Sequence, residues 1–211
     1  MAFNGFTSED FDVFHIQGLE ERMAAIRERI QPKFKAIGET VANGLAVPAG
    51  SEMCLHIAKH ARRSVNPPKD TWLAIAANKR GYKQHPHFQI GLFDDHVFVW
   101  LAFIYELPDK VNIANRFLDE IDTVAKTIPP DFVLSFDHMK KDAVSMERLG
   151  EEGLVKSIER FRDVKKAELL IGRHIAPADP ILKDGNTFTK VAMDTFETLM
   201  PIYKLSLGAN P

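Results

Sequence analysis

The sequence predicts an α+β fold in which a mainly antiparallel sheet is covered by helices. Strand-like alternation is concentrated between residues 53 and 105, where two apolar runs are joined by a short acidic turn, and helical periodicity dominates on either side. At 211 residues the chain fits a single domain, 1–211, with its core expected over about 6–205. Because no predicted strand is followed by a glycine-rich turn, we expect neither a dinucleotide fold nor a P-loop, and no cofactor.

The N-terminal part predicts two helices. A cap-like stretch with an acidic turn at residues 7–10 predicts a short first helix. Over residues 19–41, apolar side chains recur at spacings of three and four, which predicts an amphipathic second helix. Pro32 should kink or split this helix near Ile30, and Asn43-Gly44 should end it.

The central region predicts four strands, at residues 53–57, 71–77, 87–92 and 97–105. The turn at 94–96 makes the last two an antiparallel hairpin. The run 97–105 contains no polar residue, which is typical of a central strand covered on both faces.

The C-terminal part predicts helices alternating with strands. A helix begins at Pro108 and stops at Pro129-Pro130. The remaining elements are a short strand at 132–136, a helix at 146–162, a strand at 167–175 and a final helix from 188 to near Pro201.

Charge is unevenly distributed along the chain. The whole chain carries −2 at pH 7, yet residues 56–87 hold seven lysines and arginines against a single acidic residue, Asp70. This segment therefore carries +6 and the remainder −8. The asymmetry favours an anionic ligand.

The composition predicts a cytoplasmic protein without membrane association. Cys54 is the only cysteine, which excludes an internal disulfide and fits a reducing compartment. The opening residues lack a basic stretch followed by an apolar run, so no secretory signal is expected. The longest apolar run, 97–105, is about half as long as a membrane span.

Two groups of basic residues, Arg62-Arg63 before it and Lys79, Arg80 and Lys83 after it, flank the predicted strand at 71–77. If this strand pairs with the preceding one, both groups lie toward one region of the sheet. Guanidinium groups bind phosphate or carboxylate through paired hydrogen bonds, lysines add charge, and an aromatic ring can stack on a base or sugar. Two other interpretations together are as well supported as ligand binding. In one, the basic residues form a solvated loop without a ligand; in the other, the acid-rich helices neutralise the arginines. The predicted ligand-binding residues are Arg62, Arg63, Lys79, Arg80, Tyr82, Lys83 and His87, of which Tyr82 and His87 orient the ligand.

Histidine spacing gives a weaker indication. His56 and His60 are four residues apart, as in zinc proteases, but the glutamate that those enzymes place beside the first histidine is absent, and the alternation here predicts a strand. His85 and His87 would share one face of a strand, and only the turn at 94–96 offers further donors. We therefore predict no metal site.

Three functions remain open. The favoured one is a cytosolic binding domain for an anionic ligand such as a nucleotide, a phosphorylated metabolite or nucleic acid. Nucleic acid is the weakest version, because the whole chain is slightly acidic. One alternative is a hydrolytic enzyme that uses His60, His85 or His87 while arginines hold the substrate. The other is a structural or interaction protein whose basic segment docks an acidic partner.

Four segments resemble a known family. They are the opening FTSEDFDVFHIQGLEERM, the central ARRSVNPPKDTW and NKRGYKQHPHFQIGLFDDHVFVWLAFIYE, and the later VKKAELLIGRHI. These look like the YktB family, small uncharacterised proteins of Bacillus-type bacteria, over about Phe6 to Leu205. The resemblance implies a single α+β domain with an antiparallel sheet. Because that family has no established activity, cofactor or catalytic residue, the resemblance implies no residue roles.

Overall fold

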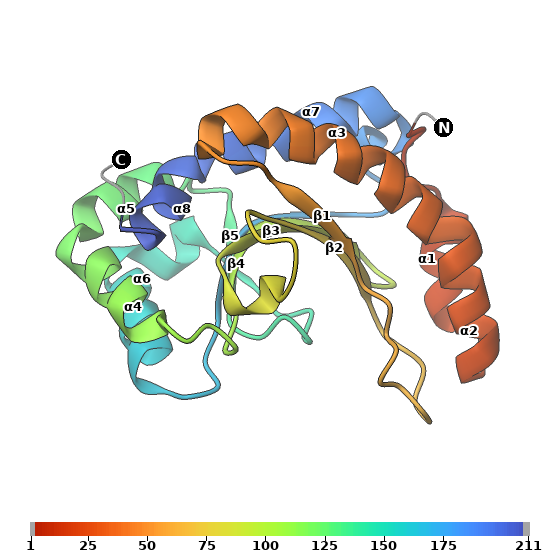
Figure 1. Ribbon diagram of the computed structural model, residues 1–211, viewed down its shortest axis with the longest axis horizontal. Helices are drawn as coiled ribbons and strands as arrows, with labels where there is room; N and C mark the ends of the chain where they lie inside the picture. The colour runs from red at the N-terminus through yellow and green to blue at the C-terminus, as the bar shows by residue number, and fades with distance from the viewer. Residues whose placement is uncertain (1–2, 209–211) are drawn as a thin grey trace.

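A seven-stranded sheet forms the centre of the computed structural model, which describes residues 3–208 (Figure 1). The strand order is β1-β2-β3-β4-β7-β5-β6, and all paired neighbours are antiparallel. Residues 1–2 and 209–211 of the expected domain lie outside the described part. The strands are β1 (Cys54–Ile57), β2 (Thr71–Ala76), β3 (His87–Leu92), β4 (Val97–Phe103), β5 (Val133–Ser135), β6 (Val144–Ser145) and β7 (Leu169–Ile175).

The predicted α+β class is confirmed, and the predicted strands are present with small shifts at their ends. The wholly apolar run forms β4, which is buried along its length between β3 and β7. The predicted hairpin joins β3 to β4 and pairs Ile90 with Val99. β1 and β2 are neighbours, with His56 opposite Ala74. The strand β6 was missed, because two residues are too few to show an alternation.

Apart from α1 and α2, the α-helices form two groups (Figure 1). α3 and α7 pack against each other and against the sheet, while α4, α5, α6 and α8 form a second group. Within the described residues, no helix is both long enough and apolar enough to cross a membrane. The α-helices are α1 (Ser8–Asp12), α2 (Leu19–Ala25), α3 (Gln31–Ala49), α4 (Lys110–Asp119), α5 (Ile121–Thr127), α6 (Met146–Asp163), α7 (Gly185–Thr198) and α8 (Met200–Ser206). Short 3-10 or π segments are η1 (Val13–His15), η2 (Ile26–Ile30), η3 (Tyr82–Gln84) and η4 (Pro180–Lys183).

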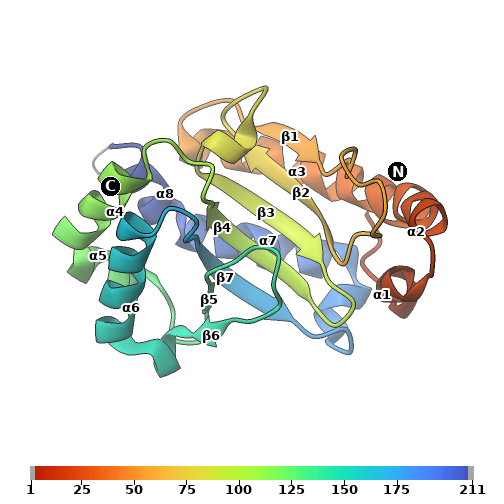
Figure 2. The same cartoon turned by 90° about the horizontal axis from the view of Figure 1, so that it is seen from below.

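The two faces of the sheet are covered differently. Side chains alternate between the faces along each strand. Leu73, Ile90 and Val99 belong to the large apolar core that the helices share. Trp72 and Trp100 belong instead to a smaller apolar cluster on the opposite face. Figure 2 shows this second face in front of α3 and α7, with the loop between β5 and β6 crossing before the strands. A loop rather than a layer of helices therefore lies in front of the second face.

The second predicted helix differs from expectation at its end. The kink before Pro32 is confirmed, because the π segment η2 separates α2 from α3 there. The predicted stop at Asn43-Gly44 is wrong, since α3 continues to Ala49 and ends at Gly50, whose φ is +71°. A Cβ on Gly44 would lie 2.8 Å from Cε of Met193 in α7, so this glycine permits close helix packing rather than ending the helix.

The predicted end of the last helix near Pro201 also needs correction. α7 ends at Thr198, and a further helix, α8, begins at Met200. Pro201 lies in the first turn of α8, where a missing backbone N–H costs no intrahelical hydrogen bond. The proline therefore marks the start of a helix rather than the end of the chain's helical part.

Candidate functional site

A pocket of about 450 Å³ lies on the second face of the sheet. Four separate segments line it: residues 58–63 after β1, Trp72 of β2, residues 82–83 of η3, and residues 138–139 in the loop between β5 and β6. Concave sites of this volume accommodate small ligands.

The chain turns sharply at the first of these segments. The N–H of Ala58 still bonds to the carbonyl of Trp72, and the β1–β2 ladder ends there. His60 then takes φ +49°, which is uncommon for a residue other than glycine. Its Nε2 lies 3.1 Å from Oγ1 of Thr71, and its carbonyl accepts the N–H of Arg63. These bonds hold the strained turn that places the arginines at the pocket.

Trp72 and Tyr82 form an aromatic wall of the pocket. Nε1 of Trp72 donates a 2.9 Å hydrogen bond to the hydroxyl of Tyr82. The ring of Tyr82 also lies 5.0 Å from the rings of His56 and His87. Nζ of Lys83 lies 5.7 Å from the Trp72 ring centroid, within the range of a cation–π contact. The wall therefore presents an apolar surface beside a positive charge.

His87 lies beneath the pocket and is fully buried. Its Nδ1 is 2.8 Å from the carbonyl of His85, and its Nε2 is 2.9 Å from Nε2 of Gln89. Gln89 in turn accepts a 3.0 Å bond from Nε1 of Trp100. Burial lowers the pKa of His87 to about 3, although the hydrogen bond with the backbone of His85 acts to raise it. The imidazole is thus a neutral, fully bonded part of the floor.

Asp70 is a buried carboxyl next to the pocket. It is 1% exposed, and neither of its oxygens bonds to another described residue. Burial raises the pKa of Asp70 to about 6, although the nearby charges of His138, Arg63 and Lys83 lower it. An unpaired buried carboxyl is costly, and such groups gather at functional sites.

The charge at the pocket is strongly positive. Lys59, Arg62, Arg63 and Lys83 all line it. Lys83 is 3.7 Å from Glu106, whereas the other three have no carboxylate within 4.0 Å in the described chain. Among the described residues, one ion pair engages these four cations, and the buried carboxyls of Asp70 and Glu168 are further acidic groups near the pocket.

The seven sequence-predicted binding residues fall into three places. Arg62, Arg63, Tyr82 and Lys83 line the pocket together. His87 lies below it. Lys79 and Arg80 do not line the pocket; they are on the surface, and Lys79 is 3.6 Å from Glu52.

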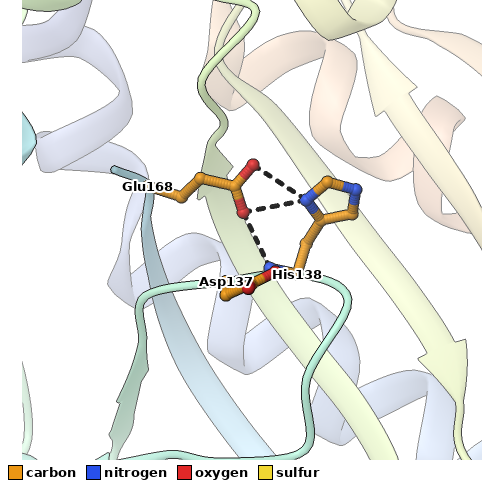
Figure 3. A group of neighbouring side chains, drawn as sticks. All are labelled: Asp137, His138 and Glu168. Carbon is orange, nitrogen blue, oxygen red and sulfur yellow. Dashed lines mark hydrogen bonds and ion pairs between the residues drawn. The ribbon is translucent and has the colours of Figure 1, made fainter. Parts of the chain in front are cut away.

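The loop between β5 and β6 brings a histidine to the pocket that no sequence pattern indicated. His138 is 8% exposed, and the neighbouring Glu168 is 2% exposed. Nδ1 of His138 lies 2.9 and 2.8 Å from the two carboxylate oxygens of Glu168, and its backbone N–H donates to Oε2 at 2.7 Å (Figure 3). A carboxylate only accepts hydrogen bonds, so Nδ1 carries a proton, and Nε2 has no hydrogen-bond partner among the described residues. Figure 3 shows Nε2 on the side of the ring away from Glu168.

Asp137, His138 and Glu168 are also the one described group with metal-ligand spacing, their donor atoms lying within 4.8 Å of one another. The ligand atoms of this group already have hydrogen-bond or ion-pair partners, however. Glu168 holds Nδ1 of His138, while Asp137 accepts the N–H of Met139 at 3.0 Å and lies 3.5 Å from Nζ of Lys140. The arrangement fits a hydrogen-bonded pair better than a ligand set.

A second hollow, of about 590 Å³, lies beside α6. Lysines and arginines line it together with Asp137 and Asp142. Lys156 at its edge is 2.5 Å from Glu152. Carboxylates thus offset much of its positive charge, unlike that of the first pocket.

Comparisons with known proteins show clear relatives. Residues 6–203 match the family described as "Domain of unknown function (DUF1054)". A UPF0637 protein of Oceanobacillus iheyensis is 58% identical, with 98% of each chain covered. One from Shouchella clausii is 56% identical over all of this chain and 98% of its own, and one from Listeria welshimeri is 50% identical over 98% and 100%. The predicted resemblance to an uncharacterised bacterial family is confirmed.

Proposed function

Because the chain belongs to the DUF1054 family, whose description assigns no activity, we propose a function from the chemistry of its pocket: it binds a small phosphorylated molecule there. The observation that carries the proposal is the meeting of Lys59, Arg62 and Arg63 with Lys83 from a separate segment, with only one nearby carboxylate paired to them. Guanidinium groups suit phosphate oxygens through paired, charge-assisted hydrogen bonds.

The wall of the pocket supports a ligand that also has an apolar part. Trp72 and Tyr82 are joined by a hydrogen bond, so their rings form a fixed surface. A nucleotide or a phosphorylated metabolite combines a phosphate with such a part. Nucleic acid fits less well, because the chain carries −2 overall.

Each residue has a separate role in this proposal. Arg62, Arg63 and Lys83 bind the phosphate, and Tyr82 orients the ligand. His87 supports the floor from below through its bond to Gln89. The chain has a single cysteine, which is consistent with the reducing cytosol. We propose that the protein meets such ligands in that compartment.

Binding can be tested with a matched pair of variants. Calorimetric titrations with ATP, ADP, pyrophosphate and glucose 6-phosphate would be run on the full chain, on Arg62→Gln/Arg63→Gln and on Lys79→Gln/Arg80→Gln. Both doubles remove two positive charges, but only the first alters the pocket. We expect the first to weaken binding at least tenfold, since hydrogen bonds to charged groups contribute about 1.5–3 kcal/mol each. The second should change it less than threefold.

The same titrations can contradict the proposal. If none of the four compounds binds, or if both double variants weaken binding equally, the pocket is not the site. A thermal shift gives an independent check, because a ligand at a hundred times its Kd stabilises the fold by about 2.7 kcal/mol.

A further inference from the structure

His138 is held as a proton acceptor at the pocket. Glu168 fixes the ring through two contacts to Nδ1 and one to the backbone N–H of His138. Nε2 has no hydrogen-bond partner among residues 3–208, and the residue lines the pocket with Arg62 and Arg63. A histidine whose Nδ1 is bonded to a buried carboxylate is oriented for general acid–base chemistry at Nε2.

Glu168 is itself well placed to hold the His138 ring in one orientation. Its carboxylate is buried, and besides His138 its only other hydrogen-bond donor in the described chain is the N–H of Tyr105, at 3.4 Å. The buried carboxylate therefore fixes the orientation of the His138 ring through Nδ1 and leaves Nε2 as the ring atom without a described partner. This pairing has no counterpart at His60 or His87, whose Nε2 atoms already bond to Thr71 and Gln89.

We propose that the pocket hydrolyses phosphodiesters, with His138 as the general base and Glu168 as its positioning residue. The proposal rests on phosphate binding at the same pocket. The oxygen of a water molecule forms a bond to phosphorus while one of its protons passes to Nε2 of His138. The bond from phosphorus to the leaving oxygen breaks, the leaving alkoxide takes a proton from solvent water, and the imidazolium returns its proton to the solvent. The products are a phosphomonoester and an alcohol, and His138 ends neutral.

Diesters are the substrate class that this geometry favours. The guanidinium groups of Arg62 and Arg63 would bind the phosphodiester and the negative charge that develops on its oxygens. Monoester transfer passes through a loose transition state in which positioning and electrostatics do most of the catalysis, so a well-oriented base contributes less there.

The test uses the full chain with two chromogenic diesters, bis-(p-nitrophenyl) phosphate and thymidine 5′-(p-nitrophenyl) phosphate. The key variant is His138→Asn, whose amide can still donate to Glu168 while the Nε2 acceptor is lost. We expect kcat to fall at least a hundredfold, with KM and pyrophosphate binding changed less than threefold. Glu168→Gln should lower kcat with a similarly small change in KM. His15→Asn, an identical change at an exposed histidine outside the pocket lining, should leave both constants unchanged.

The outcomes separate this inference from phosphate binding. If the chain binds pyrophosphate but cleaves neither diester above the rate in buffer, the hydrolase is excluded and the binding function stands. Turnover that survives in His138→Asn also overturns it, as does turnover that EDTA abolishes and a divalent metal restores. If His138→Asn fails to fold, the kcat and KM of Glu168→Gln decide: equal losses in kcat and in pyrophosphate binding would contradict the role of the pair.

Discussion

Trp72 and Tyr82 are joined by a hydrogen bond of 2.9 Å from the indole Nε1 to the phenol oxygen. The bond connects the two halves of the aromatic wall, Trp72 of β2 and Tyr82 of η3, and η3 also carries Lys83. Trp72 is only 8% exposed, so water cannot easily replace this partner. The bond therefore helps to fix the placement of the aromatic wall relative to the cation.

Tyr82→Phe should lower the free energy of unfolding by about 1 kcal/mol, because the indole N–H of Trp72 loses its acceptor. Urea unfolding at pH 7.5 measures the change. Tyr105→Phe makes the same substitution at a residue that is 44% exposed, and it should stay within about 0.5 kcal/mol of the parent chain. Equal effects of the two variants would show that the bond does not hold the wall.

Asp70→Asn should stabilise the protein at neutral pH. The pKa of Asp70 is raised by burial to about 6 in the folded chain, against 3.8 in the reference state. Between these values the folded chain keeps a proton that the unfolded chain has lost, so the stability of the parent falls as the pH rises from about 4 to about 6. The asparagine variant has no such loss. The free energy of unfolding of Asp70→Asn, relative to that of the parent, should therefore increase from about pH 4 to about pH 6, by at most about 3 kcal/mol, and stay constant at higher pH.

Urea unfolding of Asp70→Asn and the parent at pH 4.5, 5.5 and 7.5 measures that advantage. Asp119→Asn, at an exposed aspartate of α4, serves as the control and should show little difference at any of these values. An advantage for Asp70→Asn that shrinks as the pH rises would mean that the carboxyl is stabilised in its charged form instead.

His174→Phe should protect the protein against acid. The ring of His174 stacks on His96 with centroids 4.0 Å apart, and its Nε2 is buried without a partner in the described residues. Burial lowers its pKa to about 3, from 6.5. The unfolded chain therefore takes up a proton below pH 6.5 that the folded chain does not, and stability falls as the pH decreases toward 3.

The phenylalanine ring keeps the stacking but cannot take up that proton. The stability of His174→Phe relative to the parent should therefore increase by about 2 kcal/mol between pH 7.5 and pH 5. His15→Phe, at an exposed histidine, should show no comparable increase. Parallel stability curves for His174→Phe and the parent across this range would refute the assignment.

Much of the fold could be predicted because its signals are local. The uninterrupted apolar run over 97–105 indicated a central strand, and β4, at Val97–Phe103, lies in the middle of the sheet. Helix ends were harder to predict, because they depend on distant contacts. Gly44 resembles a helix stop in the sequence, yet it serves the contact with Met193 of α7. Such a role is decided by packing between segments that lie far apart in the chain.

The candidate site was only partly predictable for the same reason. Arg62 and Lys83 lie close in sequence and flank one strand, so antiparallel pairing of β1 with β2 places them at one pocket. His138 reaches the pocket only through pairing between strands that are not consecutive in the chain, because β5 pairs with β7 rather than with the strand before it in sequence. No local pattern around His138 or Glu168 indicated that they would meet. Asp70 is the single acidic residue of the basic segment, and this isolation was a sequence signal that could have drawn attention to it as part of the site.

The indole N–H spectrum tests phosphate binding at the pocket most directly, because the chain has only two tryptophans. Trp72 lines the pocket, whereas Trp100 is fully buried two strands away and bonded to Gln89. A Trp72→Phe variant assigns the two signals, and the ligand that binds in calorimetry is then titrated into the labelled parent chain. We predict that the Trp72 signal shifts saturably, with the calorimetric Kd, while the Trp100 signal moves far less. A bound ligand that leaves the Trp72 signal in place would contradict the proposed site.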